Sequence, residues 1–163
     1  MEADMNRRGF TILETVSSLL IIGILVNIAI PNYIKAKKSA EAANIIQEMD
    51  IIKKAVLMYY SDNNEWPPDT WWGVIPKELK PYLPNSIDFD KNPVLDVKYS
   101  LDNYIGNTDF QKKYGLFDVA VSVHSTDAAL INSLKNISTG NLISSKGFFN
   151  NKRLYLIIKS VEN

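Results

Sequence analysis

One long apolar segment near the N-terminus restricts what this chain can be. Residues 10 to 30 read FTILETVSSLLIIGILVNIAI and contain a single charged side chain, Glu14. As a helix, this segment would reach about 30 Å, which is the hydrocarbon thickness of a bilayer. Its apolar residues surround the helix and do not form one stripe, so burial in a soluble domain is disfavoured. We therefore expect a transmembrane helix.

A secretory signal peptide is the main alternative for this segment. Arg7 and Arg8 would form its positive region, and residues 19–26 would form its apolar core. No small-x-small cleavage motif follows the apolar run, and Ile30-Pro31 comes instead. This absence disfavours a signal peptide.

The flanking charges leave the orientation of the segment in the membrane open. Two arginines precede it, and lysines follow it at positions 35, 37 and 38. Basic residues mark the cytoplasmic side of a membrane span, so the two flanks conflict.

Glu14 does not suit a plain membrane anchor. On insertion scales, a charged carboxylate costs ~2.5 to 3.5 kcal/mol near the bilayer centre and less toward the interface. No basic residue lies three or four positions away on the same helical face. We therefore expect its partner to come from another molecule or from a new charge. Cleavage between Gly9 and Phe10 would create such a charge, the α-amino group of Phe10.

Residues 7–14, RRGFTILE, resemble the leader and processing site of type IV pilins and type II secretion pseudopilins. The resemblance includes a short charged leader, glycine before the cut, phenylalanine after it, and glutamate as the fifth residue of the processed chain. Gly23 and Pro31 fall where this family carries a helix-loosening glycine and a helix-kinking proline. Ile12-Leu13 reverses the commonest order of two apolar residues, a slight departure.

The resemblance implies a route of processing and assembly. A membrane prepilin peptidase would cut after Gly9 and methylate the amine of Phe10, with the leader in the cytoplasm. The precursor would cross the bacterial inner membrane once and be held in its lipid bilayer. An inner-membrane assembly platform would add it to a periplasmic or cell-surface filament of like subunits, with Glu14, Gly23 and Pro31 acting in assembly.

A second helical pattern follows the apolar segment. Its apolar residues recur at intervals of four and three: Ile45, Met49, Ile52, Val56 and Tyr59. We expect a helix to about Tyr60, with residues 10–30 as its membrane and assembly half and residues 31–61 as its amphipathic half. The stretch from Gly23 to Pro31 is predicted to be weak, because glycine and proline both destabilise a helix. It is an ordinary kink at the bilayer edge or, by resemblance, a stretch that unwinds in the filament.

Residues 62–163 are expected to form a globular head after the leader, residues 1–9, and the long helix. Residues 66–93 hold six of the seven prolines and all three tryptophans, which predicts an ordered loop with a helical turn at Lys77 to Lys80. Strand-like runs occupy residues 97–101, 116–123 and 154–160. Between the last two runs, Ser125 or Thr126 can cap a short helix whose shared face comprises Leu130, Leu134 and Ile137.

These patterns predict an α+β, pilin-like fold. A long N-terminal helix would pack against a small antiparallel sheet formed within residues 97–160, which buries the apolar faces of both elements.

Little in the sequence indicates catalysis or a cofactor. There is no cysteine, and His124 is the single histidine, so a thiolate metal site or a Ser-His-Asp enzyme is not expected. Residues 62–65, DNNE, lack the glycine and the distal glutamate of an EF-hand. We expect no enzyme and no cofactor. Calcium binding is left open without assigned ligands, although four acidic residues of the head are candidates: Asp88, Asp90, Asp96 and Asp102.

Nucleic acid is not an expected partner, because the chain has 18 basic and 18 acidic residues. A small basic group, Lys146 with Lys152 and Arg153, is interpreted as solvated hairpin charges. Residues 136–138, NIS, match a glycosylation sequon, a tripeptide that is frequent by chance.

Two functions from different classes are carried forward. The first is a structural subunit of a type IV pilus or a type II secretion pseudopilus. The chain has no cysteine pair that could close a C-terminal loop by a disulfide, as in many adhesive pilins, which slightly favours a pseudopilin or a disulfide-free pilin. The second is a membrane-tethered monomeric protein that recognises a sugar or peptide through Trp66, Trp71 and Trp72. A membrane-bound hydrolase finds no triad in the sequence.

Overall fold

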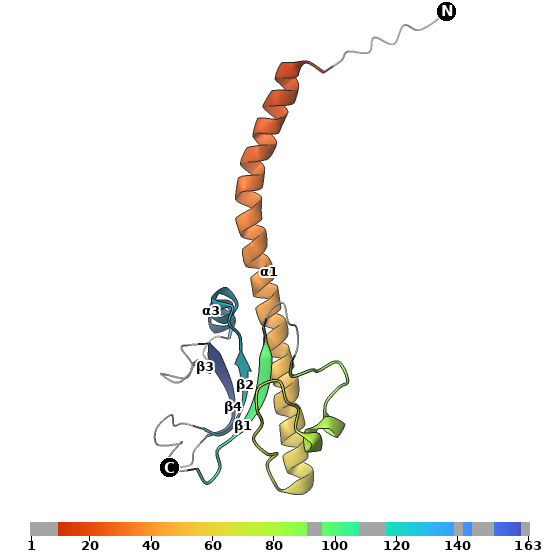
Figure 1. Ribbon diagram of the computed structural model, residues 1–163, viewed down its shortest axis with the longest axis vertical. Coiled ribbons are helices and arrows are strands. Elements are labelled where there is room, and N and C mark those ends of the chain that lie inside the picture. Colours follow the sequence, from red (N-terminus) through yellow and green to blue (C-terminus); the bar gives the residue numbers. More distant parts are fainter. Residues whose placement is uncertain (1–9, 91–95, 108–116, 139–141, 145–151, 161–163) are drawn as a thin grey trace, which may run out of the picture. The chain divides into compact units, whose positions relative to one another are not determined.

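The computed structural model describes residues 10–90, 96–107, 117–138, 142–144 and 152–160. The chain divides into two compact units, Met1–Lys37 and Lys38–Asn163, which are described separately below. The predicted leader, including Gly9, lies outside the described residues. The secondary-structure elements are α1 (Ile12–Asn63), η1 (Lys77–Tyr82), β1 (Lys98–Asn103), β2 (Phe117–His124), α3 (Ala128–Ile137), β3 (Leu142–Ser144) and β4 (Arg153–Ser160) (Figure 1).

Helix α1 contains 52 residues and continues slightly beyond the expected end near Tyr60. Asn64 follows the helix with a positive φ of 55°. Its backbone N–H donates to the carbonyl of Tyr60 at 2.8 Å. Asparagine tolerates this left-handed conformation, so Asn64 closes the C-terminal end of α1.

The second unit is built around the apolar face of α1 that the sequence periodicity predicts. Ala42, Ile45, Met49, Ile52 and Val56 are buried in one core cluster with residues of the strands and α3. Figure 1 shows this part of α1 beside the sheet. The predicted α+β class, a long N-terminal helix with a small antiparallel sheet, is therefore confirmed.

The sheet has four strands in the order β1-β2-β4-β3, and all neighbouring strands are antiparallel. Strands β1, β2 and β4 begin and end within two residues of the three runs predicted from the sequence. Strand β3 was not predicted, because three residues are too few to establish an alternating pattern. It pairs with β4 at one edge of the sheet.

Helix α3 has a different N-cap from the two expected. Asp127 caps the helix, because its Oδ1 accepts hydrogen bonds from the backbone N–H groups of Ala129 at 2.9 Å and Leu130 at 3.1 Å. Ser125 instead accepts a bond from the backbone N–H of Asp127 at 3.1 Å. Lys38 donates to Oδ2 of Asp127 at 2.7 Å and thereby connects α3 to α1. This bond also holds the pKa of Asp127 below its ordinary value.

The proline- and tryptophan-rich loop lies along β1. The backbone N–H of Thr70 donates to the carbonyl of Leu101 at 3.0 Å, and the N–H of Gly73 donates to the carbonyl of Tyr99 at 2.8 Å. Gly73 has a φ of 79°, and an added Cβ would come within 3.1 Å of Asp90 Cβ. Glycine is therefore required where the loop turns against β1. The helical turn predicted at Lys77 to Lys80 is present as η1.

Arg153 corrects the interpretation of a solvated basic group. It is only 4% exposed. Its neighbours Leu154 and Leu156 belong to the core cluster that contains α1, and because successive side chains alternate along a strand, Arg153 lies on the opposite face of the sheet. Its guanidinium forms an ion pair with Asp102 and donates to the hydroxyls of Ser100 at 2.7 Å and Ser122 at 2.9 Å. Burial of this charge is tolerated because the group has both a counterion and hydrogen-bond acceptors. Lys152 is exposed, and Lys146 lies outside the described residues.

We predict that Asp102→Ala destabilises the full-length protein by ~3 to 5 kcal/mol, because it leaves the Arg153 charge buried without its partner. Urea unfolding in detergent, followed by the tryptophan fluorescence of the head, measures this loss. The matched control is Lys152→Ala, which removes an exposed charge beside the same strand and should change the free energy of unfolding by less than ~0.5 kcal/mol. Equal stabilities of the two variants would contradict the structural role of the ion pair.

Candidate membrane and assembly surface

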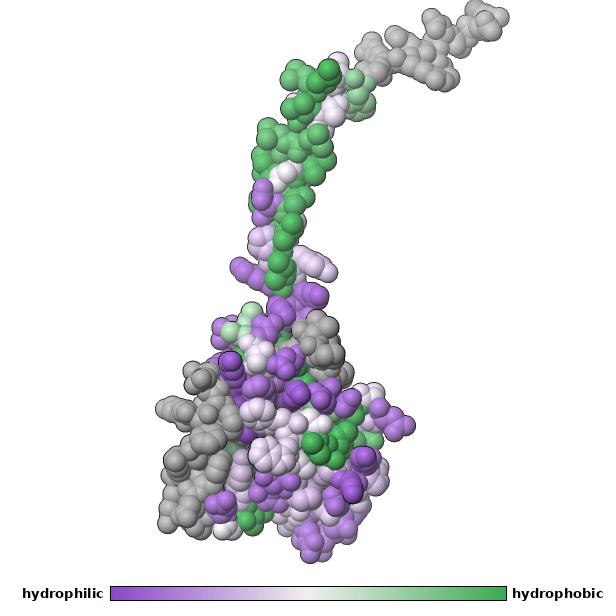
Figure 2. All heavy atoms as spheres, viewed as in Figure 1, coloured by the Kyte–Doolittle hydropathy of each residue, from purple (hydrophilic) through white to green (hydrophobic). Residues whose placement is uncertain are grey.

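The first unit presents apolar side chains on all sides of α1. An 18-residue window of this helix has a mean hydropathy of 2.1, and none of it is buried within the chain. Figure 2 shows this surface in green along the N-terminal part of α1. Its exposed large apolar residues include Ile12, Leu13, Val16, Leu19, Leu20, Ile21, Ile22, Ile24, Leu25, Ile28, Ile30 and Ile34. Water is a poor solvent for such a surface, so lipid or other apolar helices must cover it.

Glu14 lies in the first turn of α1 and forms a capping box with Thr11. The backbone N–H and the hydroxyl of Thr11 each donate to Glu14 Oε2 at 2.9 Å, and the backbone N–H of Glu14 donates to Thr11 Oγ1 at 3.2 Å. These reciprocal bonds satisfy donors that have no partner inside the helix. This role of Thr11 was not predicted, although Thr-x-x-Glu is the sequence signature of the motif.

The capping box does not neutralise Glu14. Its carboxylate accepts hydrogen bonds from neutral groups only, and it has no cationic partner in the part of the chain that the structure describes. Phe10 lies directly before the box and is 81% exposed. A negative charge therefore remains at the start of an apolar surface, and the box fixes the position of its side chain.

Gly23 and Pro31 both lie within the continuous α1 helix. An added Cβ at Gly23 would meet nothing within 4 Å, so packing inside the subunit does not require glycine there. The side chain of Asn27 donates to the carbonyl of Gly23 at 2.9 Å. Pro31 has no backbone N–H to donate to the carbonyl of Asn27, four residues earlier. The assembly roles of Gly23 and Pro31 stay predictions.

The three tryptophans of the head do not form one platform. Trp66 stacks on Tyr60 with a ring-centroid separation of 4.1 Å, and Trp72 stacks on His124 at 4.3 Å. Trp71 alone presents its ring to solvent and is 86% exposed. Intramolecular stacking thus occupies two of the three side chains that a sugar- or peptide-binding surface would use.

The four acidic side chains considered for calcium have separate partners, and Asp96 is hydrogen-bonded by Thr126. Asp90 pairs with Lys98 at 3.3 Å, Asp102 pairs with Arg153, and Asp88 accepts a bond from the backbone N–H of Asp90 at 3.1 Å. Among the described residues, no group of three or more histidine, cysteine or acidic side chains is placed to hold a metal ion. Asp62 accepts a bond from the hydroxyl of Tyr82 at 3.0 Å near the end of α1.

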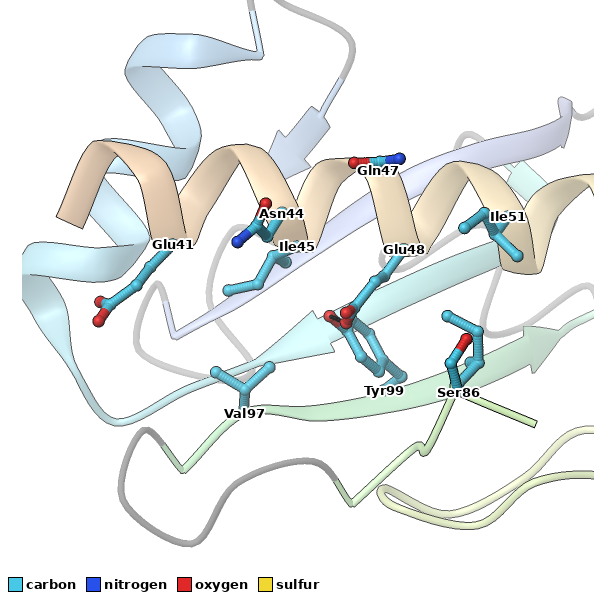
Figure 3. A pocket seen from close by; sticks show the side chains of 10 residues that line it. Glu41, Asn44, Ile45, Gln47, Glu48, Ile51, Ser86, Val97 and Tyr99 are labelled. Carbon is cyan, nitrogen blue, oxygen red and sulfur yellow. Dashed lines mark hydrogen bonds between the residues drawn. The ribbon is translucent and has the colours of Figure 1, made fainter. Parts of the chain in front are cut away.

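One groove of about 330 Å³ opens between α1 and β1 in the second unit. Ile45, Ile51 and Val97 line its apolar part, and Glu41, Glu48 and Ser86 supply polar groups (Figure 3). The hydroxyl of Tyr99 donates to Glu48 Oε2 at 2.8 Å, which joins the sheet to the helix across the groove. Burial and the nearby Glu48 carboxylate raise the pKa of Tyr99, so this hydroxyl keeps its proton.

The surroundings of His124 favour its neutral form. Burial is the main cause that lowers its pKa below the ordinary value of 6.5, and Arg153, Lys152 and Lys98 lower it further while Asp96 opposes them. Its Nδ1 is buried without a hydrogen-bond partner among the described residues. Together with the stacking of its ring on Trp72, these features indicate a packing role for His124.

Comparisons with known proteins connect this chain to secretion and pilus proteins. It is 33% identical over 67 residues to the type II secretion system core protein G of Escherichia coli strain K12, covering 41% of this chain and 46% of that protein. It is 32% identical over 79 residues to the core protein G of Klebsiella michiganensis, covering 48% and 55%. It is also 39% identical over 66 residues to the fimbrial protein EcpC of Eikenella corrodens, covering 39% and 41%.

These matches span only about half the length of the relatives. No family model matches the chain. Among solved structures, the major type IV pilin PilA1 of Clostridium difficile aligns with 77% of this chain and 98% of its own, at 23% identity and a TM-score of 0.49. The sequence relatives confirm the resemblance to pilins and pseudopilins.

We predict that acid destabilises the head through His124. Because the folded state lowers the pKa of this side chain, its neutral form contributes full stability above pH 6.5, and this contribution is lost as the pH falls through the folded-state pKa. The free energy of unfolding is measured in urea at about pH 7.5 and about pH 5.5. Its decrease between these two pH values should be smaller for His124→Phe than for the native protein. Phenylalanine can retain the stacking on Trp72. An unchanged pH dependence in the variant would show that another group causes the loss.

Proposed function

We propose that this chain, a relative of type II secretion and fimbrial proteins, is a structural subunit of a filament, either a type IV pilus or a secretion pseudopilus. In this proposal a prepilin peptidase removes residues 1–9 and methylates Phe10. The inner membrane stores the subunit until an assembly platform adds it to the filament. The observation that carries the proposal is an apolar N-terminal part of α1 that the chain leaves exposed and that bears one uncompensated carboxylate at its start.

Two environments can cover the apolar residues of α1. In the membrane, lipid chains surround the helix over about 30 Å. In a filament, the helices of neighbouring subunits replace those lipid chains. A helix that is apolar on all sides suits both environments, because none of its sides is buried against the rest of the same chain. This property supports a subunit that moves from a bilayer into a polymer.

Glu14 supplies the specificity that apolar contacts lack. Removal of the leader would give Phe10 a positively charged amine, and the amine of a neighbouring subunit would pair with Glu14. The bonds from Thr11 hold the carboxylate at the helix start and leave its charge available for that pair. A pair removed from water costs ~3 to 5 kcal/mol when one partner is lost, so it favours one axial register over its alternatives.

The proposed function is assembly and not catalysis. Its relatives are named as core and fimbrial proteins, and the arrangement of the head serves packing. The head places His124 against Trp72 and Arg153 against Asp102. We expect polymerisation to need no cofactor.

The alternative, a monomeric binding protein that uses the tryptophan-rich loop, has less support. Trp66 and Trp72 are stacked on other side chains of the head, which leaves Trp71 as the single exposed ring of the three. A carbohydrate site usually needs several convergent polar and aromatic groups. Such a protein would also keep its leader and would not polymerise.

We predict that Glu14→Ala reduces filament yield at least about tenfold while the amount of membrane-inserted protein stays the same. Glu14→Gln should be nearly as defective, because glutamine can keep the capping box but has no charge. Filament yield after shearing and membrane fractionation give the two readouts. The control Glu65→Ala removes an exposed carboxylate from the head and should assemble normally.

Glu14→Ala removes both the charge and the capping bonds of Glu14, whereas Glu14→Gln removes the charge alone. Normal assembly of both Glu14 variants would contradict the proposed register pair. Normal assembly of Glu14→Gln alone would assign the role of Glu14 to helix capping and would also contradict pairing by charge.

A further inference from the structure

Asn27 carries a carboxamide within the apolar segment of α1, and it is exposed like the apolar residues around it. It lies three residues before Ile30, which places it about 5 Å inside the C-terminal end of the segment. Its Nδ2 donates to the carbonyl of Gly23 at 2.9 Å, so the side chain points back along the helix toward the middle of the segment. In a bilayer, the carboxamide therefore lies among hydrocarbon chains and is directed away from the nearer headgroup layer.

The bond to Gly23 leaves part of the carboxamide unused. An asparagine side chain has two N–H donors and a carbonyl oxygen that accepts hydrogen bonds. One donor serves Gly23, and no other described residue bonds to the second donor or to Oδ1. Thr15 and Ser18 differ, because their hydroxyls donate to carbonyls of their own helix at 3.3 and 2.8 Å. Lipid chains neither donate nor accept hydrogen bonds, so another helix is the favourable partner for Asn27 in the hydrocarbon core.

Gly23 leaves room for another helix beside Asn27. The two residues are four positions apart and therefore share one face of α1. An added Cβ at Gly23 would meet no described residue within 4 Å, so the chain itself leaves this space open. Glycine at a contact between membrane helices allows the two backbones to approach closely. The carboxamide of Asn27 can then reach the partner helix.

A second copy of this chain supplies the complementary group. Copies in one bilayer share orientation and depth because their sequences are the same, so the two Asn27 side chains lie at one level. The second N–H of each carboxamide can donate to Oδ1 of the other while the bond to Gly23 is kept. Two reciprocal bonds then satisfy the groups that each chain leaves unused. Glu14 lies 13 positions away and about 140° around the helix, so this contact does not bring the two carboxylates together.

We propose that the face of α1 formed by Gly23 and Asn27 pairs two copies of this chain side by side in the membrane. This inference rests on the membrane-stored state of the proposed function. In the proposed filament, Glu14 lies level with the Phe10 amine of a neighbour, which shifts the two helices by four residues, or about 6 Å. The two Asn27 side chains would then lie at different levels. The pair is therefore a stored form that separates when subunits enter the filament.

Disulfide cross-linking in liposomes tests which face of α1 forms the contact. The native chain has no cysteine, so a single introduced cysteine reports a single contact. Leu20 lies seven positions before Asn27 on the same face, whereas Leu25 lies two positions before it and about 160° around the helix. Both leucines are exposed. We expect Leu20→Cys to form a disulfide-linked dimer and Leu25→Cys to form little of it.

The contribution of Asn27 is measured as the dissociation constant of the dimer in liposomes, from energy transfer between labelled copies. Asn27→Leu should weaken pairing about fivefold, and Asn27→Gln, which keeps a carboxamide, should retain most of the affinity. Gly23→Leu should also weaken pairing, because its side chain holds the helices apart without a clash inside the chain. The control Ser18→Ala removes a polar group on the opposite side of the helix and should pair like the native protein.

These liposomes contain the full-length chain without a peptidase or an assembly platform. Phe10 then has no free amine, so a dimer formed here does not depend on the proposed filament contact. Equal dissociation constants for the native protein and Asn27→Leu would overturn the inference, as would equal cross-linking of Leu20→Cys and Leu25→Cys. A native protein that stays monomeric in the bilayer would also overturn it. Filament yield of the native protein is measured separately, so none of these results decides the proposed function.

Discussion

An apolar helix surface that its own chain does not cover is the constraint on which the other features depend. The first unit exposes apolar side chains on every side of α1, and burial of such a surface away from water is favourable. Glu14 is the exception within this surface. Its capping bonds with Thr11 fix the side chain while its charge stays uncompensated. In the proposed filament, the apolar surface would supply the free energy of association, and the carboxylate would favour one axial register.

The head shows the opposite arrangement, because its charged groups find partners within the chain. Arg153 and Asp102 neutralise each other on one face of the sheet, and Lys38 links α1 to the cap of α3 through Asp127. The apolar stripe of α1 fills the other face of the sheet. A head whose ion pairs are formed within the chain can remain folded if, as proposed, the environment of the first unit changes from lipid to protein.

Periodicity made much of the fold predictable. The intervals between Ile45 and Val56 indicated the buried face of α1, and β-branched runs indicated β1, β2 and β4. Strand β3 escaped prediction because a three-residue strand carries no usable pattern. The burial of Arg153 also escaped it, because its partner Asp102 lies 51 positions away and only the pairing of β1, β2 and β4 brings the two together. In the candidate site, Glu14 was identified because it is the single charged residue in an apolar segment. The hydrogen bonds of Thr11 to Glu14 were not predicted, because Thr11 carries no charge and only charged partners of Glu14 were considered.

In the proposed function, proteolysis after Gly9 creates the cation that Glu14 lacks. The most direct test is the intact mass of the native protein purified from membranes and from sheared filaments. We predict a chain that begins at Phe10, has lost residues 1–9 and carries one added methyl group. A full-length chain that keeps the Gly9–Phe10 peptide bond in both fractions would contradict the account.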